Sequence, residues 1–153
     1  MATKLMLDDG VLELDINGRG LLRFNPSDFN LYERFCRLAK ELPEIEKQYV
    51  AEVEEQGEAD GLELAGRELA RAKEIDADIK RRLSDVFGKE NDFDQLMGGV
   101  NLMAFGKNGE RVITNLLNAL TPYLTDGINS HMQGAAAKAV AEAKAERAMR
   151  GGE

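Results

Sequence analysis

The sequence predicts a mainly α-helical protein, a bundle of about four helices with an N-terminal β-hairpin. Two patterns indicate this fold class. Apolar residues recur at three- and four-residue spacing over residues 62–86, which is typical of an amphipathic helix. Apolar and polar residues instead alternate over residues 12–16, just before the turn dipeptide Asn17-Gly18, which is typical of a hairpin strand. The chain has 153 residues, 43% of them hydrophobic, which suffices for a buried core.

The chain divides by composition into two parts. We expect a single helical domain over residues 1–124, with the hairpin at 11–24, and an alanine-rich helix or tail over residues 125–153. Alanine is the best helix former but buries little apolar area, so the C-terminal segment can be helical while packing weakly.

The register of the hairpin follows from keeping one face apolar. A two-residue loop would put Leu12 opposite Arg23. A three-residue loop pairs Leu12 with Phe24 and Leu14 with Leu22. Since a one-residue slip moves side chains to the other face of a strand, we expect the three-residue loop.

The stretch "RFNPSDFNLYERF" predicts the start of the first helix. Asn25 is expected as the N-cap, Pro26 at the first helical position, and Phe24 in contact with Phe29 as a hydrophobic staple. The helical spacing then continues through Tyr32, Phe35, Ala39 and Leu42. We interpret this stripe as core, and a partner-facing recognition strip is the alternative.

Two further helices are expected to pack on the first. Pro43 ends or kinks the first helix, which resumes after it, and the helix over residues 62–86 ends at Gly88 and packs as an antiparallel partner. A third helix over residues 110–124 is bent by Pro122. One core should contain these side chains: Phe24, Phe29, Phe35, Leu42, Leu69 and Leu83.

A glycine-broken apolar segment is the candidate partner-binding site. Asp92 can cap a short helix, and glycines at 98, 99 and 106 make one continuous helix unfavourable. Methionine adapts its shape to varied apolar partners. The candidate binding residues are Phe93, Leu96, Met97, Val100, Leu102, Met103 and Phe105. The alternative is that this loop folds over the helical pair and closes the core.

Catalytic, cofactor and metal sites are not expected. His131 is the only histidine, and it is expected at the surface without a second ligand for zinc. The "FGKNG" loop lacks the hydroxyl residue of a phosphate-binding loop. Residues 41–60 contain eight acids and one base, Lys47, which we interpret as a solvated face rather than a metal or acid–base site. We therefore expect a protein that is not an enzyme.

Charge and composition also bear on partners and location. The net charge of −8 argues against nucleic acid as a partner, because phosphate binding rests on Lys and Arg. The single cysteine, Cys36, excludes an internal disulfide and fits a reducing compartment. No run of eighteen apolar residues and no secretory signal is visible, so we expect no membrane partner and a cytoplasmic location.

The order of several short motifs resembles a known family. These are "LDINGRGLLRFNPSDFNLYERF", a helical pair, "DVFGKENDFDQLMGGVNLMA" and "GERVITNLLNALTPYL". This order resembles the tail assembly chaperone-like proteins of tailed phages and prophages of Gram-positive bacteria, over residues 11 to about 124. Two parts of the chain have no counterpart in that pattern: the acidic segment 41–60 and the alanine-rich segment after Gly134.

The resemblance implies a non-catalytic role in the bacterial host cell. Proteins of this family coat the long helical tape-measure protein and keep it soluble until the tail tube polymerises around it. It implies a tape-measure or other phage tail protein as partner. Self-association into a homo-oligomer is expected through the open hairpin edge or through the alanine-rich C-terminal helices. The alternative is a structural tail or head–tail connector subunit.

Overall fold

The computed structural model describes the backbone of residues 2–55 and 61–151, without the side chains of residues 54–55, 61–65, 131–137 and 150–151. The predicted fold class is confirmed: the structure is mainly helical with an N-terminal antiparallel hairpin. The elements in chain order are β1 (Leu12–Asp15), β2 (Leu21–Phe24), α1 (Phe29–Glu55), α2 (Gly61–Phe87), α3 (Phe93–Leu96) and α4 (Val112–Gly151).

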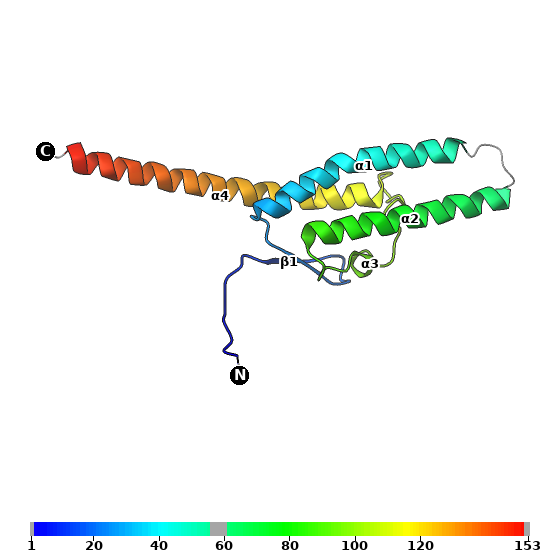
Figure 1. The fold of residues 1–153 in the computed structure, drawn as a ribbon, viewed down its shortest axis with the longest axis horizontal. Helices are drawn as coiled ribbons and strands as arrows, with labels where there is room; N and C mark the ends of the chain where they lie inside the picture. Colours follow the sequence, from blue (N-terminus) through cyan, green and yellow to red (C-terminus); the bar gives the residue numbers. More distant parts are fainter. Residues whose placement is uncertain (1, 56–60, 152–153) are drawn as a thin grey trace.

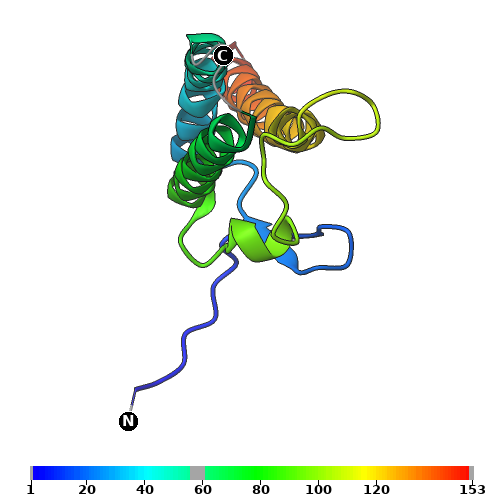
Figure 2. The same cartoon turned by 90° about the vertical axis from the view of Figure 1, so that its right-hand side faces the viewer.

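The long helices form one layer, and the hairpin and α3 cover one side of it. Helices α1 and α2 run antiparallel, and the first half of α4 lies beside them (Figure 1). The view along the helices shows the hairpin and α3 together on one side of that layer (Figure 2). The second half of α4 continues beyond the other helices, and the N-terminal segment leaves the body on the side of the hairpin (Figure 1).

The hairpin has the predicted three-residue loop. Leu12 pairs with Phe24 and Leu14 with Leu22, as expected from the apolar pattern. Asn17 and Gly18 adopt positive φ angles of 54° and 75°, a backbone conformation that Asn and Gly tolerate best. Both predicted pairs are therefore confirmed, and the turn dipeptide explains why this register is favoured.

Helix α1 begins at Phe29, three residues later than predicted, so the predicted cap and staple are wrong. Asn25 forms a turn instead: its side-chain oxygen accepts from the Ser27 N–H at 2.7 Å, and its carbonyl accepts from the Asp28 N–H. The Asp28 carbonyl accepts from the Tyr32 N–H at 3.0 Å, which makes Asp28 the residue before the first helical turn. Phe29 is then 61% exposed. An Asn-Pro pair favours a turn as well as a helix start, and here the turn is formed.

An aromatic cluster at the end of α2 joins the hairpin to the helices. The Phe87 ring packs edge-on against Phe24 of β2 at 5.2 Å and Phe35 of α1 at 6.1 Å between centroids. It also packs against Phe93 of α3 at 5.8 Å. All of these rings are buried, so one cluster fixes the relative positions of four elements.

The predicted core list is correct for half of its members. Phe24, Phe35 and Leu83 are buried, and Leu42 is partly buried against the same core. Phe29 and Leu69 are exposed, so these two assignments are wrong. The buried apolar residues described on α1 and α2 are Leu31, Phe35, Leu38, Ile75, Ile79, Leu83, Val86 and Phe87.

The error at Phe29 has a geometric cause. Phe29 precedes Phe35 by six residues, through Tyr32. At about 100° per residue, two successive three-residue steps end about 120° away from the starting face. A side chain at that position leaves the buried stripe, whereas alternating three- and four-residue steps keep to it.

Both internal prolines lie within continuous helices. Pro43 lies inside α1 and Pro122 inside α4, so the chain remains helical across both positions. Helix α4 also crosses the expected boundary at residue 124 without interruption. Leu124 and Ile128 are both buried, and the described side chains further along α4 are exposed.

We expect Phe35→Ala to lower the free energy of unfolding by about 3–5 kcal/mol, because it removes a buried ring and leaves a cavity beside Phe87. Phe29→Ala on the same helix is the matched control and should change it by less than about 0.5 kcal/mol, because Phe29 is exposed. Urea denaturation measures both. Equal losses of unfolding free energy in the two variants would contradict the burial of Phe35 and the exposure of Phe29.

Candidate partner-binding surface

The candidate segment begins with the short helix α3, which is capped as predicted. The Asp92 side chain accepts from the backbone N–H groups of Asp94 at 3.1 Å and Gln95 at 3.2 Å. The helix ends at Leu96, and Gly98 and Gly99 follow it with φ angles of 65° and 71°. This left-handed conformation suits glycine and reverses the chain direction, so α3 is confined to about one turn.

The structure places most of the predicted binding residues in the core. Phe93, Leu96, Met97, Leu102 and Met103 are buried, with exposed fractions of 7% or less. Val100 at 38% and Phe105 at 65% are exposed. The loop therefore folds over the helices and closes the core with five of its apolar residues. Only Val100 and Phe105 offer substantial surface to a partner, and their role in binding stays a prediction.

A partly buried ionic cluster anchors this loop to α2. The Lys80 ammonium lies 2.8 Å from Asp76 and 2.7 Å from Asp94. The second oxygen of Asp76 accepts from the Leu102 backbone N–H at 2.8 Å. Asn101 donates its side-chain amide to a carbonyl of α2 at 3.1 Å. In the sequence of α2, Asp76 interrupts the apolar stripe. Its role as an anchor cannot be predicted from α2 alone, because the backbone N–H that it binds belongs to Leu102.

The environment of Lys80 keeps its ammonium charged. Burial lowers the pKa of Lys80, but its hydrogen bonds to Asp76 and Asp94 outweigh that effect. The net result is a pKa above the ordinary 10.5. Because the folded-state pKa exceeds the unfolded one, the cluster stabilises the fold below pH 10.5 and loses that contribution as the pH rises through the folded-state pKa.

Arg111 fixes the end of the loop where α4 begins. Its guanidinium donates to the Glu46 carboxylate of α1 at 2.6 Å and to the Met103 carbonyl at 2.7 Å. The same group lies 4.6 Å from the centre of the Phe105 ring and 6.0 Å from that of Tyr49. Phe105 is thus held against the body through one ring face while most of its surface stays exposed.

Shallow grooves border the buried methionines. Met97 and Val100 line one of about 340 Å³ between the hairpin turn, the end of α3 and α4. Met103 lines another of about 180 Å³ between α1 and α4. Apolar side chains dominate the lining of both grooves. The first groove also includes Ile16, Val112 and Leu116. The second also includes Leu42, Ile45 and Leu117. Such grooves can accept an apolar side chain of a partner.

Part of the acidic segment 41–60 joins the helices together. We expected a solvated face, but three of its glutamates pair with arginines of α2 and α4. The pairs are Glu41–Arg82, Glu46–Arg111 and Glu52–Arg71. These glutamates are still one-third to one-half exposed, so each pair contributes modestly to stability. Residues 56–60 of the segment lie outside the described residues.

The described residues contain neither a metal-ligand cluster nor a membrane-spanning helix. Among the described side chains of residues 2–55 and 61–151, no group of three or more His, Cys, Asp or Glu could hold a metal ion. Cys36 is a free, half-buried thiol, and the His131 side chain lies outside the described side chains. In the same part of the chain, no helix combines the length and the apolar character needed to cross a membrane.

Comparison with known proteins gives no match: no protein-family model, curated protein or solved structure is similar to this chain.

We expect Asp76→Ala to destabilise the protein by about 3–5 kcal/mol, because it leaves the buried Lys80 charge with one partner and the Leu102 N–H with none. Asp94→Ala removes the other partner of Lys80, but Asp94 is 71% exposed. It should cost less than about 1 kcal/mol. Denaturant unfolding distinguishes the two, and a larger loss for Asp94→Ala would contradict the anchor at Asp76.

The raised pKa of Lys80 gives an alkaline prediction. Above pH 10.5, the free energy of unfolding of the wild type should fall more steeply than that of Lys80→Met, which has no ammonium to lose. Urea denaturation from pH 8 to pH 12 tests this, since the other titrating groups are common to both proteins. Parallel curves for the two proteins would show that Lys80 titrates alike in the folded and unfolded states.

Proposed function

We propose that this chain is a phage tail assembly chaperone-like protein that binds the tape-measure protein during tail morphogenesis, without catalysis. The proposal rests on the sequence resemblance over residues 11 to about 124. One structural observation supports it. Two of the motifs that carry the resemblance meet in one aromatic cluster, the first through Phe24 and the second through Phe87 and Phe93, so these two belong to one folded unit.

Binding of a long helical client fits the surface around the 97–105 loop. Val100 is exposed in the groove that Met97 lines, Met103 lines the second groove, and Phe105 is exposed on the same loop. A client helix that inserted apolar side chains at regular intervals could use such grooves, since methionine accommodates varied shapes. The net charge of −8 would keep the complex soluble. The proposal includes a homo-oligomer in the cytoplasm of the bacterial host, with neither nucleic acid nor membrane as partner.

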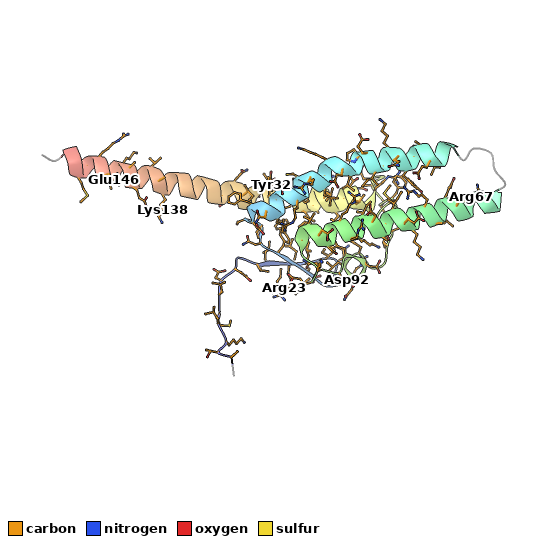
Figure 3. All side chains as sticks on the ribbon, viewed as in Figure 1. Arg23, Tyr32, Arg67, Asp92, Lys138 and Glu146 are labelled. Atoms are coloured by element: carbon orange, nitrogen blue, oxygen red, sulfur yellow. The ribbon has the colours of Figure 1, made fainter. Side chains whose placement is uncertain are left out.

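A structural tail or head–tail connector subunit is the alternative. The observation that favours it is the part of α4 beyond Ile128, which projects from the body and carries Lys138 and Glu146 (Figure 3). Val140 and Met149 are exposed along that part. A projecting helix with exposed apolar side chains suits a permanent contact with a neighbouring subunit.

We expect the double variant Val100→Ser/Phe105→Ser to fold like the wild type and to lose at least about tenfold in affinity for a tape-measure fragment, because both side chains are exposed at the proposed surface. Co-purification and titration with the fragment measure the affinity, and thermal unfolding checks the fold. Phe29→Ser is the matched control, since Phe29 is equally exposed but lies on α1 away from this loop. Unchanged capture by the double variant would exclude this surface.

Analysis of purified phage particles separates the two functions. A chaperone leaves before the particle is complete, so its peptides should be absent from mass spectra of mature virions. A connector stays at fixed copy number. Detection of this chain in stoichiometric amounts in mature particles would overturn the chaperone proposal and support the alternative.

A further inference from the structure

One edge of the hairpin is already occupied by a side chain. Asn91 is 3% exposed and pairs with the backbone of Arg23 in β2. The Arg23 N–H donates to the Asn91 side-chain oxygen at 2.9 Å, and the Asn91 amide donates to the Arg23 carbonyl at 2.9 Å. The same amide donates to the Phe87 carbonyl at 3.1 Å. Asn91 therefore takes the place of a neighbouring strand along β2.

The opposite edge, along β1, is open. Successive residues of an antiparallel strand direct their backbone N–H and C=O groups to opposite sides of the strand. Arg23 directs its N–H and C=O toward Asn91, so Leu22 and Phe24 direct theirs toward β1. By the same alternation, Glu13 and Asp15 direct their N–H and C=O groups away from β2. The described sheet has β1 and β2 as its strands, so this edge is available for backbone pairing.

The apolar side chains of β1 are less covered than those of β2. Leu22 and Phe24 are 0% and 3% exposed, whereas Leu12 and Leu14 are only half-buried. The difference lies at the open edge, where no further strand flanks Leu12 and Leu14. A strand added there would cover them and extend the apolar face of the sheet.

The N-terminal segment exposes the side chains that such a strand would need. Leu5, Met6 and Leu7 are 86%, 78% and 78% exposed, and the segment extends away from the body (Figures 1 and 2). It has no regular secondary structure of its own. We call residues 2–10 the N-terminal arm. Three consecutive exposed apolar residues in an extended arm suit burial against another surface.

We propose that residues 4–7 of the arm add to β1 of a second copy of this chain as a third, antiparallel strand. The exchange is reciprocal, so that two copies form a closed dimer with the same contacts on both sides. The pairs across the new ladder are Lys4–Asp15, Leu5–Leu14, Met6–Glu13 and Leu7–Leu12.

Charge and side-chain direction select this register. It places Leu5 and Leu7 on the same face as Leu14 and Leu12, the half-buried face of β1, and sets Lys4 opposite Asp15. A parallel arm that paired Leu5 with Leu12 and Leu7 with Leu14 would instead put Asp8 beside Asp15. Like charges opposite each other are unfavourable, so the antiparallel register is preferred.

The base of the arm explains why the partner is a second copy. The Asn25 side-chain amide donates to the Asp9 carbonyl at 2.8 Å. Asn25 directly follows β2, so this bond holds the base of the arm on the β2 side of β1, away from the open edge. Gly10 has a φ angle of 71°, and a Cβ there would lie 2.8 Å from the Asn25 amide nitrogen. The arm is thus directed outward and can reach another molecule.

The inference specifies the homo-oligomer included in the proposed function, but it rests on the hairpin and the arm rather than on the 97–105 loop, so the two proposals can fail separately. Sedimentation of the full chain should give a dimer. Met6→Pro should raise the dissociation constant by about tenfold or more, since proline removes the N–H that pairs with Glu13. Met6→Ala is the matched control and keeps that N–H, so it should stay dimeric. A wild-type monomer at high micromolar concentration, or a Met6→Pro dimer of undiminished affinity, would overturn the proposal.

Disulfide trapping between different chains tests the register and the partner together. In a Cys36→Ala background, a Met6→Cys chain mixed with a Glu13→Cys chain should form a cross-linked heterodimer under mild oxidation, because directly opposite residues lie within disulfide reach. Thr3→Cys in place of Met6→Cys is the control and should cross-link poorly. If the mixture stays uncross-linked, or if a chain carrying both cysteines cross-links only within itself, the exchange between copies is wrong.

Discussion

The packing of Phe87 against rings from three other elements is the constraint on which this structure depends. A single hairpin is marginal in water, and helices of this length gain most of their stability from tertiary contacts. Phe87 lies at the end of α2, and its contacts with Phe24, Phe35 and Phe93 link the hairpin, α1 and α3 to that end. Asn91, four residues later, adds hydrogen bonds to both β2 and α2. Ring packing and backbone pairing therefore secure the hairpin at the same place.

Sequence patterns predict the elements well where the period and the turn chemistry agree. The register of the hairpin follows from alternation together with Asn17-Gly18, and the extent of α2 from its apolar spacing and Gly88. The start of α1 cannot be predicted from the sequence in this way, because Asn25-Pro26 is compatible with both a turn and a helix cap. The predicted burial of Phe29 is wrong, because strict three-residue spacing drifts away from the buried face of a helix. The helical period alone is enough to identify this error.

The candidate surface is harder to predict, since periodicity says nothing about an irregular loop. Whether Met97 and Met103 face solvent or core depends on where the loop is held, and that is fixed by contacts distant in sequence. Asp76 and Leu102 are separated by 26 residues, and their hydrogen bond brings the loop onto α2. An acid within an apolar stripe is a usable signal, because a partly buried carboxylate needs donors. It indicates that an anchor exists, although not which backbone N–H it binds.

The two proposed surfaces, the exposed side chains of the 97–105 loop and the N-terminal arm, lie outside the aromatic cluster. Binding can therefore be changed there without unfolding the protein. Val100, Phe105 and the arm expose their side chains, so changes there remove little from the core. The edge of β2 is closed by Asn91, whose buried amide would lose its partners if another strand replaced it. Growth of the sheet is therefore directed to β1, and the same residue that holds the hairpin on α2 determines which edge a second copy can use.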